Sequence, residues 1–528
     1  MNNRVIVLKK KRVVVIGAGP AGLTAAYELL DKSNNYEVIV LEESNAYGGI
    51  SKTVNYKGNR MDMGGHRFFT KIKEVNDWWE HMLPTQGKMP KDDIKLGRKS
   101  SIIKGGPDPE KTDIVMLRRN RLSRIFFKNK FFDYPISLKI ETINNMGFFT
   151  TIAVGFSYLK SSIFKRKEKS LEDFYINRFG KKLYSMFFEN YTENLWGRHP
   201  STISPEWGAQ RVKGLSIKTI IKDIVMKTFN KKTSKVETSL IEEFSYPKLG
   251  PGQLWEITAS EIIKKKGKII KNAKVIELHK NKNEVLKSVI YQKNGEKIKL
   301  EADYVISSMP LKDLVKGMNE VPKKITNIAS NLPYRDYMTI GVLIDKLNLK
   351  NKTKIRTINN IIPDEWIYVH DKKVKMGRFQ IYNNWSPYLV KDLEGTIWIG
   401  LEYFCNEDDE MWNMTDKEFV KMGINEMITM NLIDSKNNVL DYHVERVKKA
   451  YPAYFDSYEK IDDLKNYLNR IPNLYCVGRN GQHRYNNIDH SMCTSFEAVK
   501  NIINGIEDKS NIWNVNTEKE FHEEVKSK

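Results

Sequence analysis

The chain has 528 residues, too many for a single hydrophobic core, so we expect two or more domains. Hydrophobic residues make up 40% of the chain and aromatic residues 11%, which excludes a disordered or fibrous protein. The formal net charge of +22 fits either an anionic partner or lysines spread over solvated faces. We favour the second interpretation and expect no specific nucleic-acid binding, because no RNA- or DNA-binding motif accompanies the charge.

The cysteines and the apolar runs bear on location. Cys405, Cys476 and Cys493 lie far apart and form no CxxC pair, which favours a reducing, cytoplasmic setting. The longest apolar run, 147–159, is shorter than the roughly 18 residues that a spanning helix needs. The chain start is basic but runs directly into a strand and glycines, unlike a signal peptide. We therefore expect a cytoplasmic protein and leave open a peripheral position at a membrane surface.

Hydrophobic patterns predict strands and helices in alternation. The first unit is a strand over 12–16, a helix over 21–31 and a second strand over 36–41. The chain is then mainly helical from 76 to 230, interrupted by a hairpin over 124–134 with Asn129 near its turn. The later elements are short strands over 268–308, a strand-rich region over 334–404, a strand over 473–478, a helix over 491–506 and a polar tail.

This order predicts an α/β fold with one Rossmann-like nucleotide-binding domain. We expect that domain to be built from three separated segments, with a substrate domain inserted between them. The expected bounds are 1–75, 236–318 and 446–506 for the nucleotide-binding domain, 76–235 for a mainly helical insertion, 319–445 for a strand-rich substrate domain and 507–528 for a polar, loose tail.

A glycine motif links the first strand to the first helix. Gly17 allows the tight turn, Gly19 lets the backbone approach a pyrophosphate, and Gly22 lets the helix pack on the strand. The amide groups and the dipole of the helix start favour negative phosphates. Glu42 ends the second strand 20 residues after the last glycine, where a carboxylate accepts hydrogen bonds from ribose hydroxyls.

Two further glycine segments favour FAD over NAD. Gly48 and Gly49 follow the second strand, where another close approach of backbone to cofactor is expected. Near the other end, Gly478 begins a segment that follows a strand and precedes a helix. A third segment returning to the site suits a long cofactor with an isoalloxazine ring, which NAD lacks.

Four segments resemble those of UDP-galactopyranose mutases, a branch of the FAD-dependent amine oxidase and protoporphyrinogen oxidase superfamily. Residues 65–70 resemble the segment beside the flavin, and 191–197 resemble the YTxKxWG stretch. Residues 478–489 resemble the GR…YRYxxMD stretch, and 126–135 resemble the hairpin before the inserted helices. The resemblance implies a glutathione-reductase-type, Rossmann-like FAD-binding domain with an inserted helical region and a mixed β-sheet substrate domain. It also implies a reduced flavin whose N5 attacks an anomeric carbon, with interconversion of pyranose and furanose forms of a nucleotide- or lipid-linked sugar. NAD(P)H is the candidate reductant, and a homodimer is left open.

The resemblance also implies roles for individual residues. The implied catalytic residues are His66 beside flavin N5, and Arg479 and Tyr485 at the substrate diphosphate. The implied cofactor contacts are Gly65, Asp489 and Ser491, beside Gly17, Gly19, Gly22, Glu42, Gly48, Gly49 and Gly478. The implied substrate contacts are Tyr191, Trp196 and Arg211. A core histidine, a surface arginine, a packed tyrosine and a core tryptophan are the alternatives.

The chain departs from the family pattern at the diphosphate clamp. The mutases carry two arginines four residues apart; Arg211 matches the first, and Leu215 stands at the second. Lys213 is nearby, but an ammonium is not a bidentate fork. The family's YTGxID segment is replaced by 307–312. We therefore keep a true oxidoreductase of a hydrophobic or amine substrate as the alternative activity, and an RNA-binding role as a third.

Other clusters have simpler interpretations. Five basic residues near the hairpin fit an anionic substrate or, as we prefer, a charged strand edge: Arg118, Arg119, Arg121, Arg124 and Lys128. Trp366 and residues 382–388 are aromatic and fit either a sugar wall or a core. The histidines lack metal-ligand spacing, so we predict no metal site.

Overall fold

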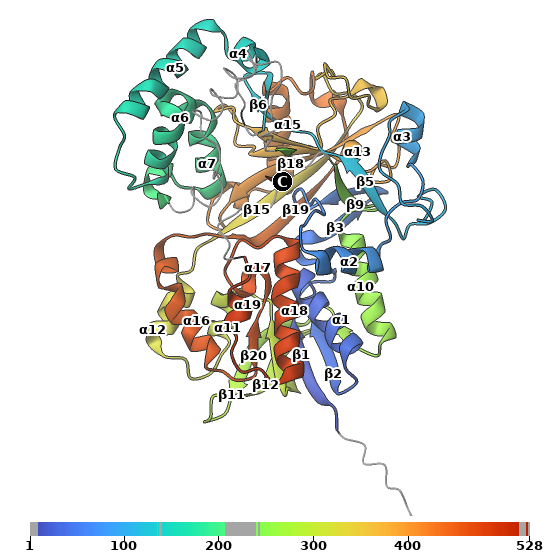
Figure 1. The fold of residues 1–528 in the computed structure, drawn as a ribbon, viewed down its shortest axis with the longest axis vertical. Helices are drawn as coiled ribbons and strands as arrows, with labels where there is room; N and C mark the ends of the chain where they lie inside the picture. The colour runs from blue at the N-terminus through green and yellow to red at the C-terminus, as the bar shows by residue number, and fades with distance from the viewer. Residues whose placement is uncertain are drawn as a thin grey trace, which may run out of the picture.

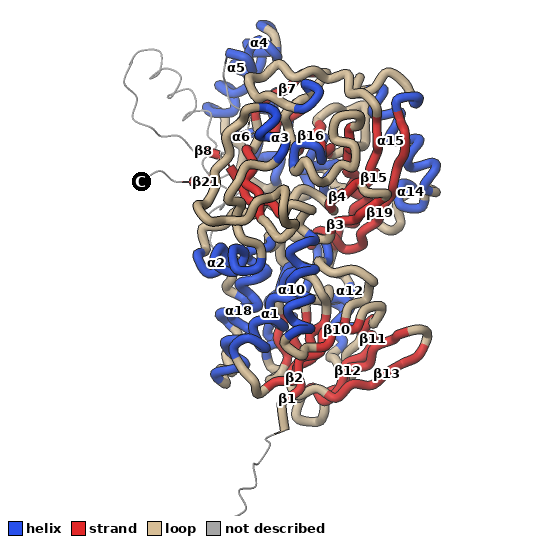
Figure 2. Tube along the Cα trace, turned by 90° about the vertical axis from the view of Figure 1, so that its right-hand side faces the viewer, coloured by secondary structure: helices blue, strands red, loops and turns tan. Residues whose placement is uncertain are grey.

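The computed structural model describes residues 9–134, 136, 140–205, 239–240, 243–516 and 524–525. Figure 1 shows two halves, with a parallel sheet between helices below and a larger sheet flanked by helices above. Figure 2 shows the same halves from the side, with the β12–β13 hairpin projecting from the lower one.

The lower half is built around a five-stranded parallel sheet in the order β10-β2-β1-β14-β20. Its strands are β1 (Lys11–Ile16), β2 (Tyr36–Leu41), β10 (Lys268–Ile270), β14 (Tyr304–Ser307) and β20 (Leu474–Cys476). Residues 13–16 are all buried, as expected for a parallel strand covered on both faces. The strands predicted over 12–16, 36–41 and 473–478 are confirmed, and segments far apart in sequence lie side by side.

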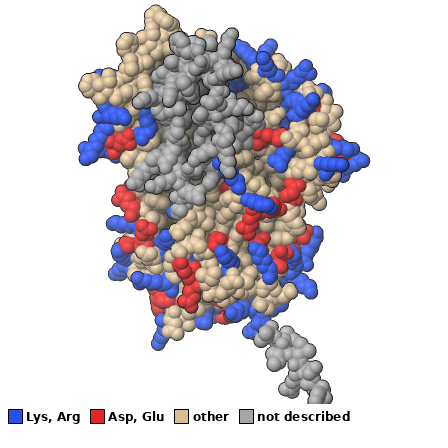
Figure 3. All heavy atoms as spheres, in the orientation of Figure 1, with Lys and Arg blue, Asp and Glu red and all other residues tan. Residues whose placement is uncertain are grey.

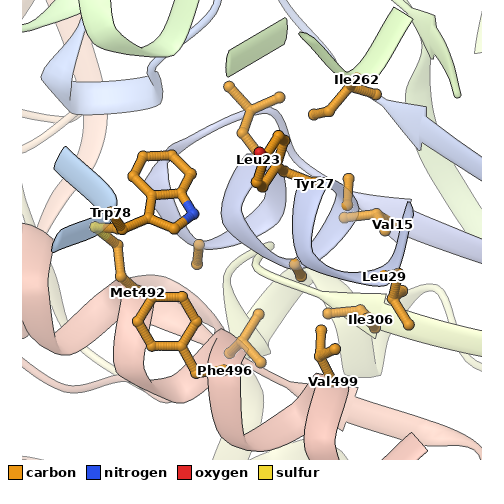
Figure 4. Packing of buried hydrophobic residues seen from close by; sticks show 14 of the residues in the cluster. Val15, Leu23, Tyr27, Leu29, Trp78, Ile262, Ile306, Met492, Phe496 and Val499 are labelled. Atoms are coloured by element: carbon orange, nitrogen blue, oxygen red, sulfur yellow. The ribbon is translucent and has the colours of Figure 1, made fainter. Parts of the chain in front are cut away.

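Successive residues of β1 face two different layers. Val13 and Val15 pack with helices α1, α2, α10 and α18, the cluster drawn in Figure 4. Val14 and Ile16 pack toward a three-stranded antiparallel sheet and helices α11, α12 and α16. The elements of these layers are α1 (Pro20–Lys32), α2 (Lys73–Met82), α10 (Gly252–Lys264), α11 (Leu311–Lys316), α12 (Lys323–Ser330), α16 (Ile461–Asn469), α17 (Gly478–Gly481), α18 (Ile488–Asn504), β11 (Lys274–Lys280), β12 (Leu286–Lys293) and β13 (Glu296–Glu301).

The upper half is built around a seven-stranded mixed sheet in the order β19-β15-β18-β17-β16-β6-β7. Its strands are β6 (Ser123–Phe127), β7 (Lys130–Asp133), β15 (Tyr334–Ile344), β16 (Trp366–Val369), β17 (Arg378–Ile381), β18 (Ile397–Cys405) and β19 (Val439–Pro452). The predicted hairpin is confirmed as β6–β7, with Phe127 opposite Lys130. Lys128 and Asn129 both have positive φ, as a two-residue hairpin turn requires.

Helices and short strands complete the upper half. Four helices form its upper left part in Figure 1: α4 (Ile140–Met146), α5 (Phe148–Ile163), α6 (Leu171–Phe187) and α7 (Glu189–Trp196). The other helices are α3 (Lys91–Leu96), α13 (Tyr382–Trp385), α14 (Glu410–Asn413) and α15 (Asp416–Thr429). The paired short strands are β3 (Thr53–Tyr56) with β4 (Asn59–Asp62), β5 (Met116–Asn120) with β9 (Glu243–Pro247), and β8 (Ser239–Leu240) with β21 (Glu524–Val525).

The structure places several boundaries differently from the sequence prediction. The boundary expected at 446 falls inside β19, a strand of the upper sheet. The β6–β7 hairpin, inside the expected helical insertion, also belongs to that sheet. Helix α12, expected in the sheet domain, packs in the lower half. The expected loose tail contains α19 (Ser510–Trp513), whose Ile512 and Trp513 are buried in the lower half.

The charged side chains are distributed more evenly than the net charge suggests. Lys and Arg are interspersed with Asp and Glu over the described face in Figure 3. The charged strand edge expected near the hairpin is wrong for two of its residues. Arg119 is buried and pairs with Asp92 at 2.8 Å, and Arg124 pairs with the buried Asp364 at 2.6 Å. In the described part of the chain, every helix is too short or too polar to cross a membrane.

Candidate functional site

A cavity of about 1430 Å³ lies between the loops of the parallel sheet and the upper half. The loops after β1, β2 and β14 contribute Gly17, Glu42 and Ser308 to its wall. Ligand pockets commonly measure about 300–1,000 Å³, so this one has room for a dinucleotide and a second molecule. Its position at the carboxyl ends of parallel strands is where open α/β sheets bind ligands.

The glycine loop has the geometry that the sequence predicts. Gly17 has φ +101°, and a Cβ there would lie 2.2 Å from Ser308 Oγ. A Cβ on Gly22 would lie 1.9 Å from the carbonyl oxygen of Gly17. These two glycines therefore close the turn and seat α1 on β1, and neither position tolerates a side chain.

Gly19 has a different role, because its surroundings are open. A Cβ on Gly19 would lie 3.8 Å from the Cα of Gly49, across the cavity wall from the second glycine loop. Gly48, with φ +98°, makes the turn that holds that loop and donates its N–H to Ala18. The two loops form a side-chain-free cradle at the start of α1, where backbone amides and the helix dipole favour phosphate.

Glu42 joins the two loops. Its carboxylate accepts hydrogen bonds from the N–H of Ala18 at 2.7 Å and from Ser44 at 2.9 Å. It also lines the cavity, so its oxygens face the space where a ribose would lie. The carboxylate therefore stabilises the loop directly, a role that the motif alone did not predict.

The third segment closes the other side of the cavity. Gly478 has φ +76°, and a Cβ there would lie 2.7 Å from Ala21 Cβ, at the start of α1. Asp489 and Ser491, in the first turn of α18, line the cavity with it, and Asp489 accepts a hydrogen bond from the N–H of His490. The two helix N-termini, α1 and α18, thus meet at one cavity.

His66 lines the same cavity as the cradle. Its Nε2 lies 3.0 Å from the carbonyl oxygen of Ile50 and 3.2 Å from that of Met63, so this nitrogen donates. Burial, assisted by the positive charge of Arg479, lowers the pKa of His66 to about 4. The ring is therefore neutral near pH 7, with Nδ1 unprotonated. The preceding residue, Gly65, has no room for a Cβ, because the Trp366 ring would lie 2.8 Å away.

Arg479 and Tyr485 come together in the cavity wall. The guanidinium of Arg479 lies 4.4 Å from the Tyr485 ring centroid, over its face. Arg479 also donates to the carbonyl oxygens of Asn486 and Ala450, which fix its orientation. Tyr485 stacks on Tyr451 at a centroid distance of 5.7 Å. Among the described residues, the hydrogen bonds that hold this arginine go to backbone carbonyls and not to a carboxylate.

Part of the cavity wall is aromatic, and we call this part the aromatic arm. Tyr191 stacks on His370 at 4.8 Å and contacts Tyr368 edge-on at 5.8 Å. Burial lowers the pKa of His370 to about 3, so this imidazole is also neutral. The other apolar wall residues come from α6, α7 and the hairpin: Ile125, Tyr134, Tyr175, Phe179, Leu183, Phe187, Phe188 and Leu195.

The structure adds a residue that the sequence analysis missed. Arg378 on β17 lines the cavity although it is buried. It donates to Glu402 at 2.6 Å and to Tyr451 at 3.0 Å, and its guanidinium lies 4.5 Å from the Trp366 ring centroid. Although burial opposes the charge, Glu402 holds the pKa of Arg378 above its ordinary value. The signal in the sequence is a charged residue at the start of a fully buried strand, paired with another on the next strand.

The remaining substrate contacts are placed elsewhere or lie outside the described residues. Trp196 is buried in the core of the upper half and does not line the cavity, so the structure gives it the core role that was the alternative. Arg211 and its neighbours Lys213 and Leu215 lie outside the described residues. Within 382–388, Tyr382 and Trp385 are core residues, whereas Trp366 does line the cavity.

The residues around the cavity fit a flavin dinucleotide. The cradle between Gly19 and Gly49 is space that a single side chain would fill. Within the described part of the chain, buried polar atoms of the wall also lack a hydrogen-bond partner: Tyr337 Oη, His370 Nδ1 and Asn480 Oδ1. Buried polar groups are normally paired, so such atoms mark positions where a bound molecule supplies the partner. The fold and the cradle together define a dinucleotide-binding protein.

Comparisons with known proteins agree with this class. Residues 15–83 match the model of the NAD(P)-binding Rossmann-like domain. Polyamine oxidase 1 of Oryza sativa subsp. japonica is 43% identical over 60 residues, 11% of this chain and 12% of that protein. The mitochondrial protoporphyrinogen oxidase of Nicotiana tabacum is 24% identical over 359 residues, 65% of this chain and 66% of that protein.

A solved structure covers nearly the whole chain. The reduced UDP-galactopyranose mutase superimposes with a TM-score of 0.74 and 19% identity, covering 96% of this chain and 97% of that chain. The first curated relatives are matched over only about a tenth of their length. The comparisons therefore show the fold, an α/β architecture with a Rossmann-like dinucleotide-binding domain, and the predicted fold class is confirmed.

Proposed function

We propose that the protein is an FAD-dependent enzyme that interconverts the pyranose and furanose forms of a nucleotide- or lipid-linked sugar. The observation that carries the proposal is one cavity lined by a dinucleotide cradle, the buried Arg378, the half-buried Arg479 and a neutral histidine. FAD, when bound in its reduced form, supplies a nucleophilic nitrogen at N5. NAD(P)H is the proposed reductant.

The residues of the cradle would hold the cofactor. Gly19, Gly49 and the N-terminus of α1 would bind the pyrophosphate, and Glu42 would accept hydrogen bonds from the ribose. Asp489 and Ser491, at the N-terminus of α18, would lie along the far part of the cofactor. Their assignment rests on their place in the wall and on the helix dipole at that point.

Arg378 and Arg479 would bind the anionic part of the substrate. Both guanidiniums face one cavity, and planar donor groups suit phosphate oxygens better than an ammonium does. Arg378 and Arg479 would take the place of the two-arginine diphosphate clamp, in which Leu215 stands at the position of the second arginine. Tyr485 would orient Arg479, and Tyr191 with Tyr368 would form the wall against which the nonpolar face of the sugar or its carrier packs.

Neutral His66 would orient groups through its free nitrogen. Its Nε2 is used by two backbone carbonyls, so Nδ1 is the nitrogen left to accept a proton or a hydrogen bond. Because the pKa of His66 is about 4, Nδ1 is a hydrogen-bond acceptor at neutral pH, and the ring carries no positive charge there.

Trapping with borohydride tests the proposal. The purified protein should be yellow, and its reduced form should convert a UDP-sugar between ring forms without consuming reductant in proportion to product. Borohydride added during turnover should yield flavin carrying the mass of the sugar. A colourless protein that does not take up FAD would overturn the cofactor assignment. A yellow protein that consumes one reductant or one oxygen per product would overturn the mutase assignment alone.

The aromatic arm favours one alternative, an FAD-dependent oxidoreductase of a hydrophobic or amine substrate. Phe179, Leu183 and Phe187 give the arm a wall without charge, which a hydrophobic substrate would fill. The similarity to a polyamine oxidase and a protoporphyrinogen oxidase is compatible with this chemistry. Oxygen uptake with candidate amines and porphyrinogens separates the two activities.

A further inference from the structure

Helix α5 exposes an apolar face that nothing in the described structure covers. Six of its hydrophobic side chains are at least 41% exposed, and Phe149 reaches 85%. The exposed set is Phe148, Phe149, Ile152, Phe156, Leu159 and Ile163, followed by Phe164 just after the helix. Monomeric soluble proteins rarely expose such a contiguous apolar patch, so we expect this face to bind a partner.

The exposed side chains lie on one side of the helix. At 3.6 residues per turn, the six positions from 148 to 163 fall within an arc of about 100°. The buried positions, Val154 and Ser161, lie on the opposite side, which packs against α6. A Cβ on Gly180 of α6 would lie 2.7 Å from the backbone nitrogen of Tyr158, so α5 is seated closely. The apolar arc is therefore the outward side of a fixed helix.

Basic residues outnumber acidic ones beside this arc. Helix α5 contains no acidic residue. Exposed basic side chains follow from its last turn onward: Lys160, Lys165, Arg166, Lys167 and Lys169. Of the acidic residues that come next, Glu168 pairs with Arg178 and Asp173 lies near Arg166. Figure 3 shows an uncharged tip at the upper left, where α4 and α5 lie, with basic side chains at its lower edge.

We infer that α5 docks the protein on an anionic lipid surface. An apolar helical face of Phe, Ile and Leu with lysines at its edge suits the boundary between headgroups and acyl chains. Anionic headgroups would meet the lysines as the apolar arc enters the bilayer. A second copy is the less suitable occupant, because a twofold contact would bring the same lysines together and offer no acid on α5 to pair them.

The position of α5 suits this role. Helices α4 and α5 form one end of the molecule, opposite the end where β1 and β2 begin, in both Figure 1 and Figure 2. Nothing else in the described structure extends past that end. Helix α6 packs on α5 and also contributes Tyr175, Phe179 and Leu183 to the cavity wall. Docking would thus bring the aromatic arm within one helix of the lipid.

Flotation of the full-length protein with vesicles tests this inference. The vesicles are phosphatidylcholine alone or phosphatidylcholine mixed with phosphatidylglycerol. We expect the protein to float with the mixed vesicles, and the variant I152E/F156E to lose at least about tenfold in partitioning because charge enters the apolar arc. K165E/K167E should also float less, and its flotation should depend less on salt.

Ile263→Glu is the matched control. Ile263 is a 55% exposed isoleucine on α10, in the other half of the molecule, and its variant should float like the parent. Circular dichroism confirms that each variant is folded, and flotation needs neither turnover nor flavin. Absence of the parent protein from the mixed vesicles would overturn the inference. Equal flotation of I152E/F156E, or a dimer that this variant dissociates without any vesicle binding, would do the same.

Discussion

Arg378 and Glu402 lie directly opposite each other on the neighbouring strands β17 and β18, and their side chains pair at 2.6 Å inside the protein. Gln380 donates to the other carboxylate oxygen of Glu402 at 2.6 Å, and Tyr451 accepts from Arg378. The buried guanidinium of Arg378 is therefore held at the cavity wall, and the Glu402 carboxylate balances its positive charge.

Removal of Arg378 alone should be more damaging than removal of the pair. Arg378→Met leaves Glu402 buried without its partner, and we expect a loss of about 3–5 kcal/mol in the free energy of unfolding. Arg378→Met combined with Glu402→Gln should recover most of that loss, because no unpaired charge remains. Urea unfolding of the parent, both single variants and the double variant measures this. Substrate binding should stay lost in the double variant; its full recovery would contradict a substrate-binding role for Arg378.

Gly19→Val should abolish flavin binding without unfolding the protein. Among the described residues, apart from the chain neighbours Ala18 and Pro20, the nearest atom to the new Cβ is the Cα of Gly49 at 3.8 Å. The side chain therefore fits the fold but fills the cradle. Absorbance at the flavin bands and circular dichroism measure the two effects. Gly155→Val is the control, since a Cβ on Gly155 meets nothing within 4 Å and lies on α5, outside the cavity. Normal flavin content in Gly19→Val would show that the pyrophosphate lies elsewhere.

His66→Ala should keep the flavin and slow turnover by about 10²-fold, the usual scale for a positioned acid–base or electrostatic group. The ring is neutral above its pKa of about 4, so the parent's turnover should show no change near pH 6.5 that depends on His66. Steady-state rates across the pH range measure both. His279→Ala, which changes an exposed histidine on β11, serves as the control. A rate unchanged in His66→Ala would return this residue to the core-histidine interpretation.

Stability should fall as the pH falls below 6.5. His483 is fully buried, its Nε2 bonds to the carbonyl oxygen of Ala453, and burial lowers its pKa to about 4. Between pH 6.5 and pH 4 this histidine binds a proton in the unfolded chain but not in the folded protein. Each such histidine therefore reduces the free energy of unfolding by up to about 1.4 kcal/mol per pH unit. His66 and His370 act in the same direction.

His483→Gln isolates one of these contributions. Glutamine does not titrate, and its amide can still donate to Ala453. Urea unfolding at several pH values between neutrality and pH 4 should show a dependence shallower by one proton than in the parent. The same slope in both proteins would mean that His483 is protonated in the folded state.

The sequence predicts those parts of the site that depend on local conformation. The turn at Gly17, the seating of α1 by Gly22 and the β6–β7 turn at Asn129 all follow from residues close together in the chain. Strand β1 was predictable because four successive apolar residues fit only a strand buried on both faces.

The rest depends on contacts between distant segments. The sequence favours an exposed strand edge for Arg119, because its partner Asp92 lies on α3 and no sequence pattern links α3 to β5. Trp196 matched a motif, but only the packing of α7 decides whether its ring reaches the cavity or the core. Arg378 was missed because its pairing with Glu402 depends on the register of β17 and β18. Long-range register is a property of the whole sheet, and a single sequence does not state it.

The order of the parallel sheet also governs when this protein can mature during synthesis. Strands β1 and β2 emerge from the ribosome first, but β20, beside β14, ends only at Cys476. Gly478, which closes the cavity against α1, emerges later still. Nascent chains that end before β20 cannot complete the sheet, and the apolar strands β1 and β2 then lack their later neighbours. Flavin binding therefore has to wait until the segment after β20 has been made, and truncation before Gly478 should be as harmful to it as a lesion in the first glycine loop.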